Sequence, residues 1–169
     1  MAMQTPLELF LHELSDMYDA EKRIAQTLPI LANESTDQQL KDAYQQHEAE
    51  TQHHIQNLDQ CFQVLGKQPS STTCYAIAGL KQEHDAFLKE QPTPEILSLF
   101  NLGCAAKTEA YEIVSYKGLV EKAAAMGYNK CAQLLQENLG QEEEMARRIE
   151  QFAQRLSKTK VTSQQKSSG

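Results

Sequence analysis

Hydrophobic residues recur every three or four positions along most of the 169-residue chain, which is the spacing of one face of an α-helix. Four long stretches keep this spacing, at about residues 6–32, 37–65, 96–125 and 129–156, and a shorter one covers about residues 74–89. Glycine and proline are scarce, with seven and five residues, while good helix formers dominate. The pattern therefore predicts an all-α protein with four long helices and one short helix.

Capping residues mark the ends of these helices. Thr5-Pro6 and Thr93-Pro94 each place a capping threonine before a proline at the first helical position, which suits the start of a helix. Gly66 suits the end of the second long helix, because glycine accepts the left-handed conformation found just after a helix. The cap at the start of that helix is either Thr36 or Asp37.

The order of the helices predicts a bundle. Short connections join the first long helix to the second and the third to the fourth, so each pair should form an antiparallel hairpin. Residues 66–92 must then cross the length of the bundle, and a loop, a short helix and a second loop can cover that distance. We expect one antiparallel four-helix bundle at residues 1–156, with the short extra helix in its crossover. A flexible polar tail rich in Lys, Ser and Gln should follow at residues 157–169.

Charge and composition limit which partners the protein can bind and where in the cell we expect it. The chain has 23 Asp and Glu against 16 Lys and Arg, and its formal net charge of −7 argues against binding to nucleic acid. No apolar run reaches the roughly 18 residues of a membrane span, and the N-terminus does not resemble a secretory signal. The cysteines form no Cys-x-x-Cys pair, so we expect free thiols in a cytoplasmic protein. They are Cys61, Cys74, Cys104 and Cys131.

Each long helix carries one glutamate within or beside its apolar stripe. Glu21, Glu109 and Glu142 each lie seven residues, almost two helical turns, from a core-type residue on both sides, and Glu50 flanks its stripe closely. No Lys or Arg falls on these stripes. Because mid-helix positions of an antiparallel bundle meet at one level, we expect the four carboxylates to converge at the centre.

A metal centre best explains inward-facing carboxylates that have no basic partner. Glu112 adds a fifth carboxylate one turn from Glu109, and the second long helix offers an imidazole from His47, His53 or His54. His47 is the best placed of the three, and His53 lies off the stripe. His54 faces inward, either as a ligand or as a core histidine with a bonded partner. Sites rich in carboxylate and poor in imidazole suit iron or manganese, so we expect such ions here, as a pair if both positions are complete.

Five segments of the chain resemble the YciE/YciF-like family of bacterial ferritin-like stress proteins. They are HELSDMYDAEK at 12–22, HEAET at 47–51, CYAIAGL at 74–80, EAYEI at 109–113 and LLQENLGQE at 134–142. The resemblance extends over about residues 5–156 and implies a ferritin-like bundle that forms a homodimer and takes part in a stress response. It implies no particular reaction, because a fold does not determine an activity.

The wider relatives of that family are rubrerythrin-like di-iron bundles, and their pattern implies a ligand set for this chain. The implied ligands are Glu21, Glu50, His53, Glu109, Glu112 and Glu142, with His47 as the residue that the YciE/YciF-like family favours in the second helix. The remaining imidazole of the rubrerythrin-like pattern falls at the level of Ala146, which has no donor atom. One metal position is therefore expected to be weaker than the other.

Two functions from different classes follow from these observations. The first is a di-metal carboxylate protein of stress or oxidative defence, which binds iron or manganese or handles peroxide. The second is a metal-free dimeric structural or adaptor bundle whose acidic cluster is a relic. The chain has no rubredoxin-like Cys-x-x-Cys module, so a redox reaction would need an external electron donor.

Overall fold

The computed structural model describes the backbone of residues 2–167 and the side chains of residues 2–158. Over this part of the chain there are five helices and no strands. The helices are α1 (Pro6–Glu34), α2 (Gln38–Leu65), α3 (Tyr75–Leu88), α4 (Pro94–Ala125) and α5 (Asn129–Ser167). The prediction of an all-α protein with one short helix among four long ones is confirmed.

Hydrogen bonds from capping side chains fix where the long helices begin. The Thr5 hydroxyl accepts a hydrogen bond from the Glu8 N–H at 3.2 Å, and the Glu8 carboxylate accepts one from the Thr5 N–H at 2.8 Å. This reciprocal pair is a capping box, and it satisfies two backbone donors that the helix itself leaves open. Thr93 caps α4 through its side chain, and Asp37, rather than Thr36, caps α2.

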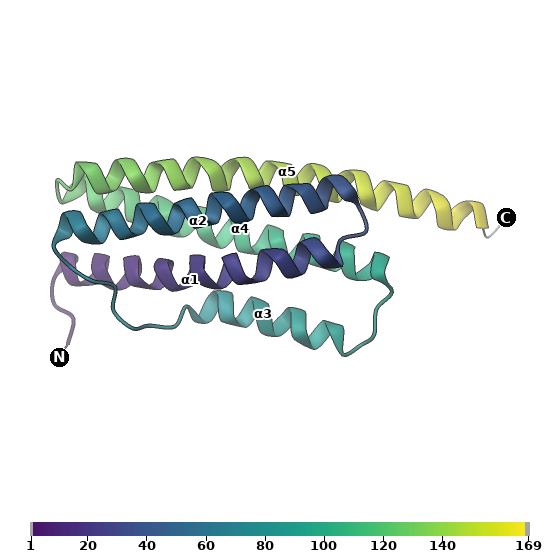
Figure 1. Ribbon diagram of the computed structural model, residues 1–169, viewed down its shortest axis with the longest axis horizontal. Helices are drawn as coiled ribbons and strands as arrows, with labels where there is room; N and C mark the ends of the chain where they lie inside the picture. The colour runs from purple at the N-terminus through teal and green to yellow at the C-terminus, as the bar shows by residue number, and fades with distance from the viewer. Residues whose placement is uncertain (1, 168–169) are drawn as a thin grey trace.

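The four long helices form an antiparallel bundle, and α3 lies on its outside (Figure 1). α1 packs against α2 and α4 packs against α5, and the two hairpins meet where α1 contacts α4 and α2 contacts α5. The crossover carries the chain to the opposite end before α4 begins, so neighbouring long helices run in opposite directions (Figure 1). α3 packs on α1 and α4. The bundle with an extra helix in its crossover therefore agrees with the prediction.

The last helix is longer than the sequence indicated. Its end was expected near Leu156, but α5 continues to Ser167, so that boundary was wrong. No glycine or proline follows Gly140 before Ser167, and Lys and Gln are good helix formers, so nothing in this segment stops the helix. Figure 1 shows the end of α5 projecting beyond the other helices. The flexibility expected of residues 157–169 stays a prediction.

Hydrophobic side chains fill the bundle on both sides of a polar central layer. In α1, Phe10 and Leu14 are buried before Glu21, and Ile24 and Leu28 are buried after it. The other long helices likewise bury apolar side chains at their two ends and polar ones near the middle. The central polar groups are therefore separated from solvent along the bundle axis by two apolar layers.

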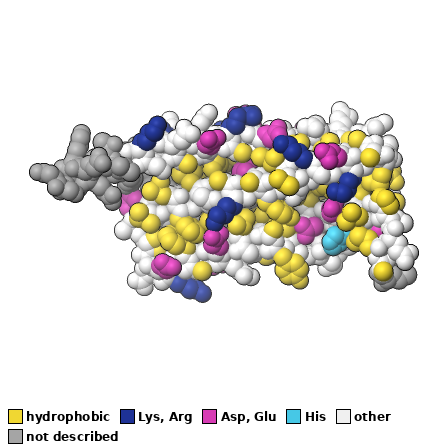
Figure 2. Space-filling view, turned by 180° about the vertical axis from the view of Figure 1, so that it is seen from behind, with side chains coloured by type: hydrophobic (Ala, Val, Ile, Leu, Met, Phe, Trp, Pro, Cys, Tyr) yellow, Lys and Arg dark blue, Asp and Glu magenta, His cyan; other side chains and the backbone are white. Residues whose placement is uncertain are grey.

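The outer surface carries charges of both signs. On the face shown in Figure 2, acidic and basic side chains are scattered among hydrophobic ones, and neither sign forms a continuous patch. None of the helices that the structure describes is long and apolar enough to cross a membrane. The densest group of ionisable side chains lies instead in the central layer.

Candidate metal centre

Six ionisable side chains meet in the central layer, each with at most 2 % of its surface exposed. They are Glu21 of α1, His47 and His54 of α2, Glu109 and Glu112 of α4, and Glu142 of α5. Each lies towards the middle of the part of its helix that belongs to the bundle, and the antiparallel arrangement brings these levels together. The structure thus brings together five of the seven predicted ligands, all except Glu50 and His53, and adds His54.

The first group of donor atoms comes from three helices. His47, Glu109, Glu112 and Glu142 each present one donor atom, and these atoms all lie within 4.8 Å of one another. The Nε2 atom of His47 lies 3.4 Å from Glu109 Oε1 and 3.4 Å from Glu142 Oε2. Neither contact has hydrogen-bond geometry, and this nitrogen has no other partner among the described residues. The atoms are therefore arranged around a shared position rather than bonded to one another.

The second group consists of Glu21, His54 and Glu142, whose donor atoms also lie within 4.8 Å of one another. The Nδ1 atom of His54 lies 2.9 Å from Glu142 Oε1 and 3.3 Å from Glu21 Oε1. Glu142 belongs to both groups, since its Oε1 faces His54 and its Oε2 faces His47. Glu142 is therefore the residue that would help to hold a metal ion in either group.

Most carboxylate oxygens of the central layer lack hydrogen-bond donors among the described residues. Within residues 2–158, both oxygens of Glu112, both of Glu142, and Oε2 of Glu21 and Glu109 are buried without a hydrogen-bond partner. A buried charged oxygen without a partner is costly, because it has lost its hydration and gained nothing in return. Cations bound between the carboxylates would remove that cost, and the oxygen and imidazole donors suit iron or manganese. The residues present therefore fit a pair of metal ions.

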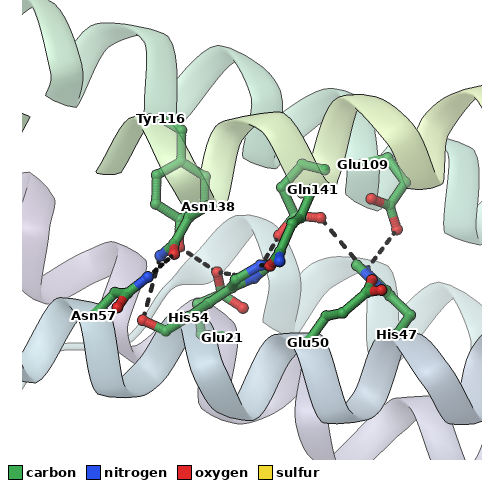
Figure 3. Close-up of polar contacts among 10 residues, drawn as sticks. Glu21, His47, Glu50, His54, Asn57, Glu109, Tyr116, Asn138 and Gln141 are labelled. Atoms are coloured by element: carbon green, nitrogen blue, oxygen red, sulfur yellow. Dashed lines mark hydrogen bonds and ion pairs between the residues drawn. The ribbon is translucent and has the colours of Figure 1, made fainter. Parts of the chain in front are cut away.

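Neighbouring side chains hold the outer nitrogen of each imidazole (Figure 3). His47 Nδ1 lies 3.2 Å from Glu50 Oε2, and His54 Nε2 lies 2.7 Å from Gln141 Oε1. Histidines that bind metals commonly use the second ring nitrogen in this way, which fixes the orientation of the ring. Glu50 is 24 % exposed, and its other oxygen accepts a hydrogen bond from Gln46. Glu50, a predicted ligand, is in neither group of donor atoms, and in this structure it contacts His47 from outside the central layer.

A chain of hydrogen bonds fixes the carboxylate of Glu21. The Tyr116 hydroxyl donates to Glu21 Oε1 and accepts a hydrogen bond from Asn138 Nδ2 at 3.0 Å. Asn138 in turn accepts from Asn57 Nδ2 at 2.8 Å, and its own Nδ2 also lies 3.3 Å from the backbone carbonyl of His54. Figure 3 shows this chain between α2, α4 and α5. Oε1 of Glu21, which also faces His54, is thus held in place, and Oε2 has no hydrogen-bond partner among the described residues.

Burial and charge shift the pKa values of the central groups upward. Burial, with repulsion from neighbouring carboxylates, raises the pKa of Glu112 well above 4.5, and burial also raises the pKa values of Glu21 and Glu142. Burial alone would lower the pKa values of the imidazoles, but contacts with carboxylates outweigh it. The pKa of His54 rises to about 10, and that of His47 rises well above 6.5. If all four carboxylates were ionised and both imidazoles protonated, the charges would sum to −4 + 2 = −2, so full ionisation would leave the layer deficient in positive charge.

His53 lies outside the central layer, so the structure does not bring it together with the other predicted ligands. Its side chain is 45 % exposed, and its Nε2 lies 3.0 Å from Glu137 Oε1 at the surface. The reason is the pitch of α2: successive residues point about 100° apart, so the neighbour of the inward-facing His54 points away from the core. The Glu-x-x-His spacing was therefore misleading here.

The second imidazole of the centre is His54, which the sequence left open as a ligand or a core histidine and which the ligand set implied by the resemblance omitted. The signal was present, because His47 and His54 are seven residues apart, the same spacing that identified the inward-facing glutamates. The rubrerythrin-like pattern instead predicted the second imidazole at the level of Ala146 on α5. Since each group of donor atoms contains one imidazole, a missing imidazole at Ala146 gives no reason to expect one weak position.

The fold and the central layer define a ferritin-like helical bundle with a buried cluster of carboxylates and imidazoles. The crystal structure of the Escherichia coli stress protein YciF matches with a TM-score of 0.87 and 30 % identity, over 92 % of this chain and 99 % of YciF. YcfI from Rhodopseudomonas palustris matches with a TM-score of 0.83 and 34 % identity, over 87 % of this chain and 94 % of YcfI. A protein from Xanthomonas campestris shares the fold, with a TM-score of 0.76 and 22 % identity, over 95 % of this chain and 99 % of its own.

The chain belongs to the family described as domain of unknown function DUF892, whose model matches residues 5–162. Among characterised sequences, protein YciF of Escherichia coli (strain K12) is 34 % identical over 143 residues, which cover 84 % of this chain and 86 % of YciF. The resemblance to the YciE/YciF-like family is therefore confirmed.

Proposed function

We propose that this protein binds two divalent metal ions, iron or manganese, in the central layer and uses them in stress or oxidative defence. The observation that carries the proposal is the convergence of buried donor atoms without hydrogen-bond partners among residues 2–158. Each group of donor atoms offers carboxylate oxygens and one imidazole nitrogen, and Glu142 is common to both groups.

Charge balance supports two ions rather than one. With neutral imidazoles, the buried carboxylates of the central layer carry −4, and two divalent ions carry +4, so the sum is zero. With one divalent ion and all four carboxylates ionised, the sum is −4 + 2 = −2. Because burying net charge in an apolar interior is costly, the layer is best neutralised by a pair of ions.

The surrounding residues would control what the ions can do. Bound iron or manganese would supply one-electron chemistry to a small oxidant. Tyr116 holds Glu21 by a hydrogen bond and is buried with it, so it fixes the orientation of this carboxylate without admitting water. The two apolar layers exclude bulk solvent along the axis of the bundle. The description of the relative YciF as a stress protein agrees with such a role.

The second candidate is a metal-free structural or adaptor bundle. It is favoured by the contacts at 2.9–3.4 Å between the two histidines and the carboxylates, which partly neutralise the layer without any metal. The homodimer and the cytoplasmic location expected from the sequence remain predictions under either function.

Metal content separates the two candidates. The full chain, purified without chelators and dialysed against excess Mn²⁺ or anaerobic Fe²⁺, should hold two ions per chain by elemental analysis. Glu142→Gln should hold at most one, because it alters the carboxylate common to both groups. Glu137→Gln, an exposed change on the same helix, is the matched control and should hold two. Equal, background-level metal in all three proteins would leave the structural bundle as the function.

A further inference from the structure

A small pocket opens between α1, α3 and α4 and ends at the central layer. Its volume is about 40 Å³. Most of its wall is apolar, formed by Ile24, Leu28 and Leu31 of α1, Ile77 and Leu80 of α3, and Ala105 of α4. Glu109, a member of the first group of donor atoms, also lines the pocket. The pocket therefore joins the outside of the bundle to a carboxylate of the candidate metal centre.

The hydroxyl groups in the pocket wall are engaged with their own helices. Thr27 donates to the carbonyl of Arg23 at 2.9 Å, and Thr108 donates to the carbonyl of Cys104 at 3.0 Å. These side chains therefore have no hydroxyl hydrogen left to donate to a molecule in the pocket.

The charged groups on the α3 side of the pocket are also paired. His84 Nε2 lies 2.8 Å from Glu34 Oε2, and Lys81 pairs with Asp85. Glu109 is different, because it is 2 % exposed and its Oε2 has no hydrogen-bond partner in the described part of the chain. Among the residues of the two groups of donor atoms, Glu109 is the one that lines this mostly apolar pocket.

Helix α3 is attached firmly enough to make the pocket a lasting feature. The N–H of Cys74, at the start of α3, donates to Asp19 of α1 at 2.7 Å. Near the other end of the helix, Phe87 stacks on Phe100 of α4 with ring centroids 3.8 Å apart. Figure 1 shows α3 lying along the bundle between these attachment points. The pocket therefore lies under a helix that is held at both ends.

We propose that this pocket is the binding site and access route for dioxygen. The inference rests on the proposed metal centre and names its oxidant. A volume of about 40 Å³ is too small for an organic substrate, since a cavity of roughly 150 Å³ is what holds benzene. Hydrogen peroxide and water need several hydrogen-bond partners, so this mostly apolar wall suits them less well than a small apolar molecule, which needs none. In the reaction, dioxygen would accept one electron from each of two ferrous ions and two protons, and would leave as hydrogen peroxide.

The first test uses xenon, an apolar probe of similar size, and needs no metal. Xenon-129 NMR of the metal-free full chain should detect binding, and Ala105→Leu should abolish it by filling the pocket. Ala106→Leu is the matched control, because it adds the same side chain to the exposed neighbouring position of α4 and should leave xenon binding unchanged. Absence of xenon binding in the starting protein, or equal binding in Ala105→Leu, would overturn the assignment.

The second test compares two oxidants in anaerobic protein loaded with Fe²⁺. In stopped-flow experiments, Ala105→Leu should slow oxidation by dioxygen about tenfold or more while changing oxidation by hydrogen peroxide less than twofold. Leu80→Ala, which widens the pocket from α3, should act in the opposite direction and provides a second variant if the first fails to fold. Equal slowing of both oxidants would contradict a dioxygen-specific route. Failure to bind Fe²⁺ would refute the proposed function. The xenon experiment needs no metal, so it would still show whether the pocket binds a small apolar molecule.

Discussion

The negative charge of Glu112 should destabilise the metal-free protein but favour the binding of metal ions. Its carboxylate is fully buried, and neither oxygen has a hydrogen-bond partner among residues 2–158. Burial, reinforced by the charges of Glu142 and Glu21, raises its pKa well above 4.5, so the folded metal-free protein favours the protonated form of this group more than the unfolded chain does. We expect Glu112→Gln, which keeps the shape and removes the charge, to stabilise the metal-free protein and weaken metal binding.

The size of the effect follows from the cost of holding a proton. A carboxyl group that stays protonated in the folded state at a pH above its ordinary pKa of 4.5 costs about 1.4 kcal/mol per pH unit. For Glu112 this amounts to up to about 3 kcal/mol at pH 7, and to less than about 1 kcal/mol at pH 5. Glutamine carries no such cost. The stabilisation of the metal-free protein by Glu112→Gln should therefore be large at pH 7 and small at pH 5.

Urea unfolding followed by circular dichroism, in chelator-treated protein at both pH values, measures the difference directly. Glu121→Gln is the matched control, because this glutamate is exposed on the same helix, and the change should alter the free energy of unfolding by only a few tenths of a kcal/mol. The reasoning is refuted if Glu112→Gln destabilises the metal-free protein equally at both pH values. That result would mean that the native carboxylate is ionised and well paired. A titration with Mn²⁺ should show weaker binding to Glu112→Gln than to Glu121→Gln.

Three further outcomes are expected. The raised pKa values of Glu21 and of His54 (about 10) mean that the folded metal-free protein binds more protons than the unfolded chain. Its free energy of unfolding should therefore fall as the pH rises from about 5 towards 10, and Mn²⁺ should restore it at pH 7; a curve that is flat with and without metal would contradict this. His54→Ala should lose one of two Mn²⁺ ions in elemental analysis while the surface variant His53→Ala keeps both, and equal losses would disprove the assignment of His54. Tyr116→Phe should lower the free energy of unfolding by about 2 kcal/mol in urea titrations, because buried Glu21 loses its donor, and an unchanged midpoint would show that this hydrogen bond is unimportant.

The fold followed from local signals that agree with one another. Capping at Thr5 and Thr93 and the glycine at position 66 set helix ends that the structure reproduces within a residue or two. The weak point was the end of α5, because the polar segment after Leu156 lacks an apolar stripe but also lacks any residue that stops a helix. Loss of amphipathic pattern shows where packing ends, and it does not by itself show where helical structure ends.

The candidate site was predictable where a residue lies at the centre of a stripe, and less so at the edges. Glu21, Glu109 and Glu142 were identified from seven-residue spacing alone, and all three lie in the central layer. Glu50 lies at the edge of its stripe, where a small rotation of α2 decides between facing the core and facing a neighbour such as His47. That rotation depends on packing between helices, and the spacing of hydrophobic residues within one helix gives no information about it.

The crossover helix α3 contributes a wall of the pocket and none of the donor atoms of the central layer. Substitutions at Ile77 or Leu80 can therefore change how molecules reach the centre while every ligand keeps its place. Within a family, access to the centre and metal chemistry can therefore diverge separately, because substitutions in α3 leave the donor atoms of the central layer unchanged. Exchanging residues 74–89 between relatives should transfer the preference for an oxidant and leave the affinity for metal with the recipient bundle.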